Sequence, residues 1–290
     1  MKARDVKRKI ISIKNFNEIT YALCLISMIK MKRAQKMVLE TKPFIEIVFE
    51  ILGELVNREE DIKGTIYFKE NQGKNLAVVI ASDRGFCGAY NRNILNFAQR
   101  EIEKLGNTEV FPIGKKAIKF FKKRNFKISD KIFGIGDFGE LEETKPIADK
   151  LIGYFKQGNY QKIFIFYTRF VSPFLQKPAK IQLLPLSSEM LNELFKEHKM
   201  EIKKSLFVLL EPSPREILEN LVPQLIRYLV HYSVLQANAS EHSARMLAMK
   251  RATENTKEII KKLTLKYNKC RQTEITNEVC EISLTKEAIQ

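Results

Sequence analysis

The chain has 290 residues, 44% of them hydrophobic, and its 50 basic and 34 acidic residues give a formal net charge of +16. The length fits one or two ordinary domains, and the hydrophobic fraction argues against a disordered polymer. No apolar run approaches the roughly 18–20 residues that span a bilayer, which argues against a membrane-spanning helix.

The first segment, residues 1–42, contains neither glycine nor proline. Either residue in an exposed helix interior costs roughly 1 or 3 kcal/mol, so a tract free of both favours one long helix. Apolar residues recur every three or four positions and form a stripe, at Val6, Ile10, Ile13, Phe16, Ile19, Leu23 and Ile26. Further apolar residues widen this stripe after residue 16, which indicates contact with more than one surface.

The middle of the chain, roughly residues 58–212, alternates strand and helix patterns. The alternation predicts an open α/β sheet of the Rossmann-like kind, whose strand order one sequence does not give. We expect strands at Asn75–Ser82, Glu109–Ile113, Tyr160–Val171, Lys177–Leu186 and Ser205–Leu210. We expect helices at Asn91–Leu105, Lys115–Arg124, Ile147–Phe155 and Ser188–His198.

The last segment, residues 224–290, again lacks glycine and proline. Ser213, Pro214 and Glu216 have the order of an N-cap, a first helical residue and a capping-box acid. We expect the helix to run to about residue 282, with a kink or short break at Pro223. Its seam has the alternating four and three spacing of a left-handed coiled coil, at Tyr228, Tyr232, Leu235, Ala239, His242, Met246, Met249, Thr253, Thr256, Ile260, Leu263, Tyr267 and Cys270.

The two terminal helices are natural antiparallel partners, because a helix of this length needs support along it. We therefore predict an α/β protein that combines a long antiparallel coiled coil of the N- and C-terminal helices with a central open α/β domain. The expected segments are a coiled-coil helix over residues 1–57, the α/β domain over 58–212 and a second coiled-coil helix over 213–290.

The positive charge is concentrated in the two helical segments. Residues 1–42 carry a net charge of +8, and residues 245–271 carry +7. A surface this basic implies an acidic partner, which is a nucleic acid, an anionic membrane or an acidic protein.

Residues 134–139, Gly-Ile-Gly-Asp-Phe-Gly, match the dinucleotide-binding pattern G-x-G-x-x-G. That site needs a strand before the glycines and a helix opening on them, so that backbone N–H groups meet the pyrophosphate. Here only Ile132 and Phe133 precede the glycines, and Pro146 interrupts the segment after them. We therefore expect a loop without a nucleotide.

A second motif, SDRGFCGAYN over residues 82–91, ends the first apolar strand. Asp83 and Arg84 at the carboxyl end of a strand, with glycines nearby, are typical of a ligand site in an α/β sheet. They are equally typical of a tight turn in which the aspartate accepts hydrogen bonds and the glycines supply positive φ. The residues alone leave both alternatives open.

No part of the chain predicts an active site, a metal site or a cofactor site. The three histidines are far apart in sequence, and His242 on the helix seam is expected to set register or contact a partner. Cys87 has no neighbouring base, so a small buried thiol is expected. The four cysteines lack metal-type and disulfide spacing, which favours reduced thiols in the cytosol, and the N-terminus does not resemble a signal peptide.

The second motif and both ends of the chain resemble the gamma subunit of F-type ATP synthase, a central rotating stalk. Asp5–Ile10 and Asn15–Thr20 are similar to the opening helix of that family, and SDRGFCGAYN is close to its pattern S-[DS]-R-G-L-C-G-x-[FY]-N. Ala239–Lys250, Tyr267–Lys269 and Arg271–Thr276 are similar to its signature region. The resemblance extends over the whole chain, in order.

The resemblance implies a shaft without catalytic activity or cofactors, which transmits torque between the proton-driven c-ring in the membrane and the catalytic hexamer of alpha and beta subunits. It implies that the coiled coil lies inside the hexamer and that the α/β domain lies against the epsilon subunit and the c-ring. It further implies partner contacts at seven positions, which are Lys30, Asp83, Arg84, Arg245, Arg271, Gln272 and Thr276.

The resemblance also implies a peripheral protein on the cytoplasmic side of a bacterial inner membrane. The chain lacks the inserted regulatory cysteine pair of chloroplast versions and a transit segment. Four departures from the family pattern concern the contacts of the helix ends. Tyr21 stands where a basic residue is usual and Leu23 where Met is common. Ser27–Ile29 replaces a run of small residues, and Ser283–Lys286 stands where the tail usually contains Gly or Ala.

Two other functions are alternatives. A basic coiled-coil protein that binds nucleic acid would show a steep salt dependence, but no binding module is recognisable and the aromatic residues are not interleaved with the basic runs. A nucleotide-dependent enzyme that uses the α/β domain would show saturable binding of ATP or NAD.

Overall fold

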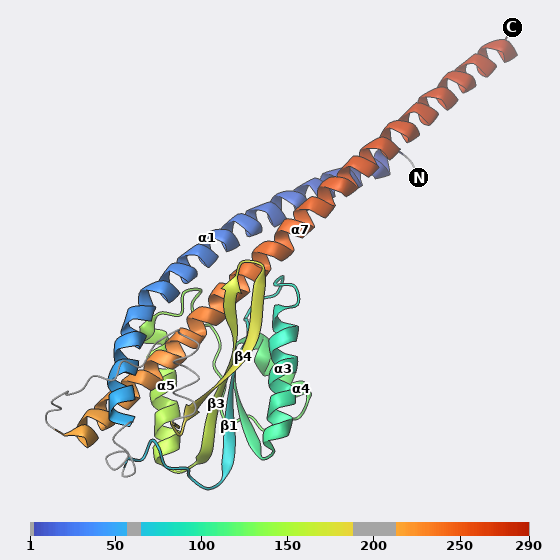
Figure 1. The fold of residues 1–290 in the computed structure, drawn as a ribbon. Helices are drawn as coiled ribbons and strands as arrows, with labels where there is room; N and C mark the ends of the chain where they lie inside the picture. Colours follow the sequence, from blue (N-terminus) through green and yellow to red (C-terminus); the bar gives the residue numbers. More distant parts are fainter. Residues whose placement is uncertain (1–2, 57–64, 188–212, 290) are drawn as a thin grey trace. The chain divides into compact units, whose positions relative to one another are not determined.

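The computed structural model describes residues 3–56, 65–187 and 213–289 (Figure 1). The helix predicted at Ser188–His198 and the strand predicted at Ser205–Leu210 lie outside these residues. Among the described helices, none combines the length and the apolar character needed to cross a bilayer.

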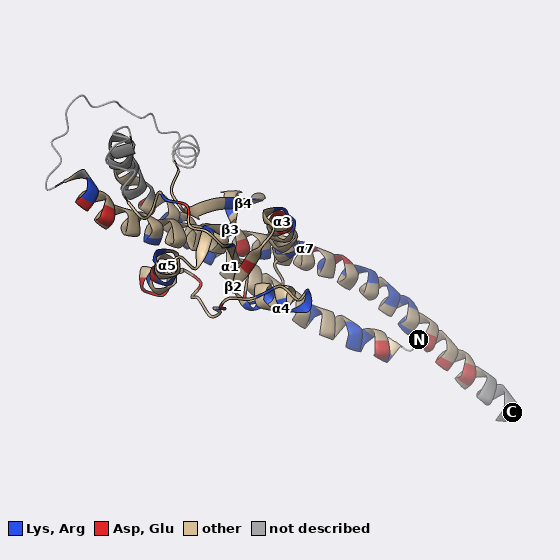
Figure 2. Cartoon of the chain, turned by 90° about the horizontal axis from the view of Figure 1, so that it is seen from below, with Lys and Arg blue, Asp and Glu red and all other residues tan. Residues whose placement is uncertain are grey.

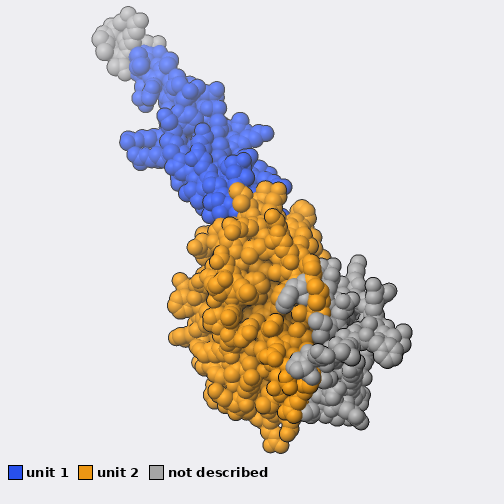
Figure 3. Space-filling view, turned by 90° about the vertical axis from the view of Figure 1, so that its left-hand side faces the viewer, with its two compact units in different colours: residues 1–27, 245–290 blue, residues 28–244 orange. Residues whose placement is uncertain are grey.

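The chain forms two compact units, and both terminal helices contribute to both of them. α1 spans Ala3–Val56 and α7 spans Pro214–Ile289. Unit 1 comprises Met1–Ser27 with Arg245–Gln290, and unit 2 comprises Met28–Ala244 (Figure 3). The predicted division of the sequence into three segments stays a prediction.

α7 begins at Pro214, as predicted, because Ser213 caps it. The hydroxyl oxygen of Ser213 accepts a hydrogen bond from the backbone N–H of Glu216 at 3.3 Å, which satisfies one of the free donors of the first turn. The helix then continues through Pro223 without interruption. Of the predicted kink or short break, the break is therefore wrong and the kink stays a prediction. The reason is packing, since neighbours such as Val222 are fully buried and support the helix there.

Unit 1 is an antiparallel pair of helices. The N–H of Ala3 donates to the carboxylate of Glu274 at 2.8 Å, and the thiol of Cys24 lies 3.6 Å from the carbonyl oxygen of Met246. Residue numbers therefore rise along one helix as they fall along the other. On α7 the less exposed positions of this unit follow the predicted four and three spacing, at Met246, Met249, Thr253, Thr256, Ile260, Leu263, Tyr267 and Cys270.

The seam of α1 departs from the prediction after Ile13. The expected stripe passed through Phe16, Ile19 and Ile26, but these side chains are 51%, 57% and 48% exposed. The less exposed positions instead keep the four and three spacing through polar or small residues, at Asn17, Thr20, Cys24 and Ser27.

Hydrogen bonds between polar side chains account for this change of seam. The amide of Asn17 donates to the hydroxyl of Thr256 at 2.5 Å and to the carbonyl of Thr253 at 2.9 Å. The hydroxyl of Thr253 donates to that of Thr20 at 3.0 Å. We call these four residues the polar ladder. Buried polar residues of this kind fix the register of a coiled coil.

Unit 2 contains a four-stranded sheet in the order β2-β1-β3-β4. β1 (Lys74–Ile80) runs parallel to β2 (Thr108–Ile113) and to β3 (Tyr160–Ser172). β4 (Leu175–Leu184) pairs antiparallel with β3, because only a short turn joins the two strands. The predicted open α/β sheet is confirmed.

Helices cover both faces of this sheet (Figure 1). Successive residues of β1 point to opposite faces. Its odd-numbered residues join a buried cluster with α3 (Tyr90–Leu105) and α4 (Lys115–Lys123). Its even-numbered residues join a larger cluster with α5 (Leu141–Lys156) and with the part of α7 that belongs to unit 2.

Polar side chains of α7 also hold the β3–β4 hairpin within unit 2. The amide oxygen of Gln236 accepts the N–H of Phe170 at 2.8 Å. The hydroxyls of Ser240 and Ser243 donate to backbone carbonyls of β3 and of the hairpin turn, at 3.0 and 2.6 Å. All three α7 side chains are buried, so solvent competes little for these hydrogen bonds.

Candidate functional site

The glycine motif forms a loop at the carboxyl edge of the parallel strands of unit 2. Residues 133–139, which we call the bracket loop, follow Ile132, whose backbone pairs with Ile113 at the end of β2. This described segment has neither a strand leading into the glycines nor a helix opening on them, so the predicted loop is confirmed. Pro146 was expected to interrupt the next helix, but it lies inside α5, which begins at Leu141.

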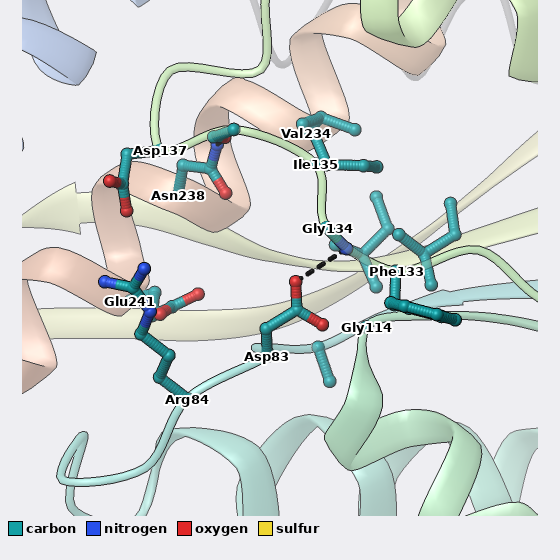
Figure 4. A pocket seen from close by; sticks show the side chains of 14 residues that line it. Asp83, Arg84, Gly114, Phe133, Gly134, Ile135, Asp137, Val234, Asn238 and Glu241 are labelled. Carbon is teal, nitrogen blue, oxygen red and sulfur yellow. Dashed lines mark hydrogen bonds between the residues drawn. The ribbon is translucent and has the colours of Figure 1, made fainter.

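Carboxylates of the chain itself occupy the backbone donors of the bracket loop. The N–H of Gly134 donates to Asp83 at 2.8 Å (Figure 4). The N–H of Gly136 donates to both carboxylate oxygens of Glu143 at 3.1 Å. In a dinucleotide site, such N–H groups face the pyrophosphate. The bracket loop therefore does not fit a nucleotide.

α1 contacts the bracket loop through two basic side chains. Lys30 forms an ion pair with Asp137, and the guanidinium of Arg33 lies 4.0 Å from the centre of the Phe138 ring. Burial raises the pKa of Asp137, but the ammonium of Lys30 and other basic groups nearby outweigh burial, so the pKa is lowered from its ordinary value. Asp137 therefore stays ionised at neutral pH and attracts α1.

α7 contacts the same loop through side chains on successive turns. The amide of Asn238 donates to a glycine carbonyl of the loop at 3.2 Å, and the imidazole of His242 lies 3.3 Å from the carbonyl oxygen of Asp137. Gly139 has φ 53°, and a Cβ atom there would come within 2.5 Å of Cγ1 of Val234. The bracket loop thus connects both terminal helices to the sheet of unit 2.

Asp83 connects three segments of unit 2. One carboxylate oxygen accepts the N–H of Lys115 at the start of α4, at 2.8 Å, and the other accepts the N–H of Gly134. Gly114 permits this arrangement, because it has φ 95° and its Cβ would come within 2.0 Å of the carbonyl oxygen of Ala81. Asp83 therefore accepts hydrogen bonds from backbone groups of its own chain.

The rest of the SDRGFCGAYN motif is a turn above a buried thiol. Phe86 and Gly88 have φ values of 62° and 57°, so a glycine supplies only one of the two positive angles. The amide of Asn91 donates to the sulfur of Cys87 at 3.1 Å, and Cys87 is 2% exposed. The predicted small buried thiol is confirmed, and the turn is the alternative that this geometry supports.

A cavity of about 210 Å³ lies among the bracket loop, the end of β1 and α7 in unit 2 (Figure 4). Two of its acids are already engaged, since Asp83 accepts two backbone N–H groups and Asp137 is paired with Lys30. In the part of the chain that the structure describes, no group of three or more His, Cys, Asp or Glu side chains is placed to hold a metal ion. The polar residues of the cavity are Asp83, Arg84, Asp137, Asn238 and Glu241.

Three of the seven predicted contact residues are brought together in unit 2 by the bracket loop, namely Lys30, Asp83 and Arg84. The other four lie in unit 1, where Arg245 is 9% exposed. The remaining three are exposed on α7, at Arg271, Gln272 and Thr276. The sequence patterns missed the α7 side of the loop, at Val234 and Asn238, although the glycine spacing marked the loop itself.

Comparisons with known proteins agree over nearly the whole chain. A family model described as ATP synthase matches residues 2–289. Three relatives are named ATP synthase gamma chain. They come from Ruminococcus albus (34% identical, 97% of this chain and 96% of the relative), Roseiflexus castenholzii (36%, 97% and 96%) and Akkermansia muciniphila (36%, 99% and 99%).

Solved structures with a similar fold belong to mitochondrial ATP synthases. One is in the OSCP/F1/c-ring structure from Euglena gracilis, with a TM-score of 0.64, 19% identity and coverage of 99% of this chain and 94% of that chain. Another is in the central stalk and c-ring structure from Tetrahymena thermophila, with a TM-score of 0.62, 22% identity and coverage of 81% and 99%. At these identities the likeness concerns the fold.

Proposed function

The chain belongs to the family of ATP synthase gamma chains, and from this membership we propose that it is the central rotor shaft of an F-type ATP synthase. In this role it transmits torque between a proton-driven ring of c subunits in the membrane and a hexamer of alpha and beta subunits. The observation that carries the proposal is the family match over residues 2–289, which includes both long helices and the sheet.

The surface of unit 1 supports a position inside a collar of other subunits. Large apolar side chains of α1, such as Phe16 and Ile19, are more than half exposed, and exposed apolar surface of this kind marks interaction sites. The same helices carry the two basic segments of the sequence. A collar with apolar and acidic surfaces would cover both.

The bracket loop supports the transmission of torque within unit 2. Torque passes through a body only if its parts do not slip against each other. The loop connects α1, α7 and the sheet by an ion pair, a cation–π contact and hydrogen bonds. These directional contacts resist slippage more than apolar packing alone.

Among the predicted contact residues, we assign partner contacts to the exposed ones, which are Arg84, Arg271, Gln272 and Thr276. Lys30 and Asp83 are engaged inside the chain, and Arg245 is buried. We assign to these three the positioning of the helices that carry the contacts.

The proposal includes the remaining expectations about the complex. The shaft is not catalytic, and ATP chemistry takes place in the alpha and beta subunits around it. The epsilon subunit and the c-ring contact the α/β part, and the complex lies on the cytoplasmic side of a bacterial inner membrane. The chain alone is expected to hydrolyse no ATP.

Co-expression and rotation test the proposal. The tagged chain is expressed with the alpha and beta subunits of its own organism, and we expect a complex with three copies of each per chain. A bead is attached to the introduced cysteine of an Asn96→Cys, Cys270→Ser, Cys280→Ser triple variant, because residue 96 is exposed on α3 and the two native cysteines that remain, Cys24 and Cys87, are buried. We expect ATP to rotate the bead continuously in one direction.

A matched control separates rotation from tethered diffusion. The same bead is attached to a complex whose beta subunits cannot hydrolyse ATP, and no directed rotation is expected. A chain that purifies without the two larger subunits, or a bead that stays still while the complex hydrolyses ATP, contradicts the proposal.

A further inference from the structure

α4 in unit 2 is rich in lysine, and Figure 2 colours the lysines and arginines of the chain blue. Residues 115–127 contain seven basic residues and no acidic one. Ala117 and Phe121 are fully buried on the side that faces the sheet. We call the exposed lysines of the helix the lysine face, which consists of Lys115, Lys116, Lys119, Lys122 and Lys123.

Helix geometry places the lysine face on one stripe. Successive residues of an α-helix turn by about 100°, so these five lysines fall within an arc of about 120°. The core residues Ala117 and Phe121 fall outside that arc. The stripe therefore presents its charges together to one partner surface.

Carboxylates of the described residues do not neutralise the lysine face. Within the described residues, no ion pair involves Lys116, Lys119, Lys122 or Lys123. Several other lysines of unit 2 are ion-paired with carboxylates, namely Lys30, Lys74, Lys127, Lys150, Lys162 and Lys180. What distinguishes α4 is that its exposed lysines lie together on one stripe of a single helix.

An exposed aromatic ring lies at the N-terminal end of the lysine face. The ammonium of Lys115 lies 5.5 Å from the centre of the Phe133 ring, which is 57% exposed. Basic residues beside an exposed aromatic side chain are typical of surfaces that lie on lipid headgroups.

We infer that the lysine face docks on the anionic headgroups of the membrane beside which the complex works. Clusters of four to eight basic residues near a membrane attract anionic lipids. The inference rests on the proposed function, because that function places unit 2 close to a membrane. It adds a surface and a partner that the function by itself does not require.

The choice of lysine favours lipid over other anionic partners. An ammonium is a compact, strongly hydrated point charge, whereas arginine offers the planar fork that matches a fixed carboxylate or phosphate. A rotating shaft moves past individual lipids, so its basic groups must pass from one headgroup to the next. Point charges suit this better than groups that need a fixed geometry. Nucleic-acid surfaces interleave basic residues with stacking aromatic rings, whereas the exposed ring of Phe133 lies at one end of the lysine face and not between its lysines.

Vesicle binding by the full chain tests the inference. The chain is sedimented with phosphatidylcholine vesicles that contain phosphatidylglycerol and with vesicles of phosphatidylcholine alone, over a range of salt concentrations. We expect binding only to the anionic vesicles. The variant K116Q/K119Q/K122Q/K123Q is expected to bind them about tenfold or more weakly, whereas the corresponding four Lys→Arg changes keep binding.

A matched variant controls for the loss of charge. K257Q/K261Q/K262Q/K266Q removes four exposed lysines from unit 1, and it is expected to bind the anionic vesicles within about threefold of the original chain. Circular dichroism checks that all variants keep their helix content. The inference is overturned if the two quadruple variants lose equal affinity, or if the original chain does not distinguish the vesicles.

Two further measurements distinguish lipid binding from RNA binding and from a failure of assembly. Loss of affinity for single-stranded RNA but not for vesicles in the α4 variant would overturn the inference in favour of a nucleic-acid surface. Assembly with the alpha and beta subunits is measured on the same variants and is expected to be normal. Normal assembly without vesicle binding overturns the lipid inference alone, whereas failed assembly of the original chain contradicts the proposed function.

Discussion

Gly139 and Val234 approach each other so closely that a Cβ atom on residue 139 would come within 2.5 Å of the valine Cγ1. This contact fixes the distance between the bracket loop and α7 in unit 2. Residue 139 also has φ 53°, a left-handed conformation that L-residues other than glycine rarely adopt.

Gly139→Ala is expected to lower the free energy of unfolding by about 2–4 kcal/mol, because left-handed backbone strain and overpacking act together. Urea unfolding followed by circular dichroism measures the change. Gly153→Ala is the matched control, since residue 153 lies inside α5 with open space around it. This control is expected to stabilise by about 0.5–1 kcal/mol. Equal effects of the two substitutions would contradict the close contact.

Asp83→Asn tests the double acceptor at the end of β1. A carboxylate can accept from both Lys115 and Gly134, whereas an amide places a donor against one of these N–H groups. We expect a loss of about 1–3 kcal/mol in the free energy of unfolding. Glu103→Gln is the control at an exposed carboxylate and is expected to change stability by less than about 0.5 kcal/mol. A loss of similar size in both variants would contradict the assigned role.

A double-mutant cycle tests the polar ladder of unit 1. Asn17→Ala and Thr256→Val each remove one partner of the 2.5 Å hydrogen bond, so their effects on unfolding are expected to couple by about 0.5–3 kcal/mol. Asn17→Ala with Thr264→Val is the control, because Thr264 is exposed and bonds only within its own helix. The control pair is expected to be additive within about 0.5 kcal/mol. Additivity in the first pair would mean that the ladder does not join the two helices.

Glu109 gives unit 2 a defined dependence on pH. Burial raises the pKa of this carboxyl, but hydrogen bonds from Lys127, Lys74 and the hydroxyl of Tyr160 outweigh burial and lower the pKa from 4.5 to about 2. The folded state therefore binds this proton more weakly than the unfolded state. The resulting stabilisation is complete above pH 4.5 and is lost as the pH falls toward about 2.

Glu109→Gln measures this contribution. At neutral pH the substitution is expected to lower the free energy of unfolding by about 1–3 kcal/mol, since charge-assisted hydrogen bonds are lost. The difference from the original chain is expected to shrink as the pH falls from 4.5 toward 2. Unfolding curves at several pH values show the trend. A difference that stays constant over this range would contradict the lowered pKa.

Much of the fold could be predicted because the patterns that carry it are local. Absence of glycine and proline marks the terminal helices, and the apolar run at β1 marks a buried strand. The seam of α7 follows heptad spacing even where it is polar. The antiparallel pairing of β4 was not predictable in the same way, since strand order depends on contacts between distant segments.

The errors come from polar residues that find partners far away in the sequence. Asn17 and Thr20 interrupt the apolar spacing of α1, so apolar spacing led to Phe16, whereas hydrogen bonds to α7 decide the seam. In the same way, the glycine spacing at residues 134–139 matches the sequence pattern of a nucleotide-binding motif. Asp83 and Glu143 occupy its amides instead, and no local pattern reveals their approach.

The attachment of α7 to the β3–β4 hairpin affects how unit 2 deforms under load. Apolar burial is non-directional, but Gln236, Ser240 and Ser243 each bond to a defined backbone atom. Turning the helix about its own axis would break all three bonds at once. Rotation of this helix within unit 2 therefore carries the hairpin with it for as long as these three bonds hold.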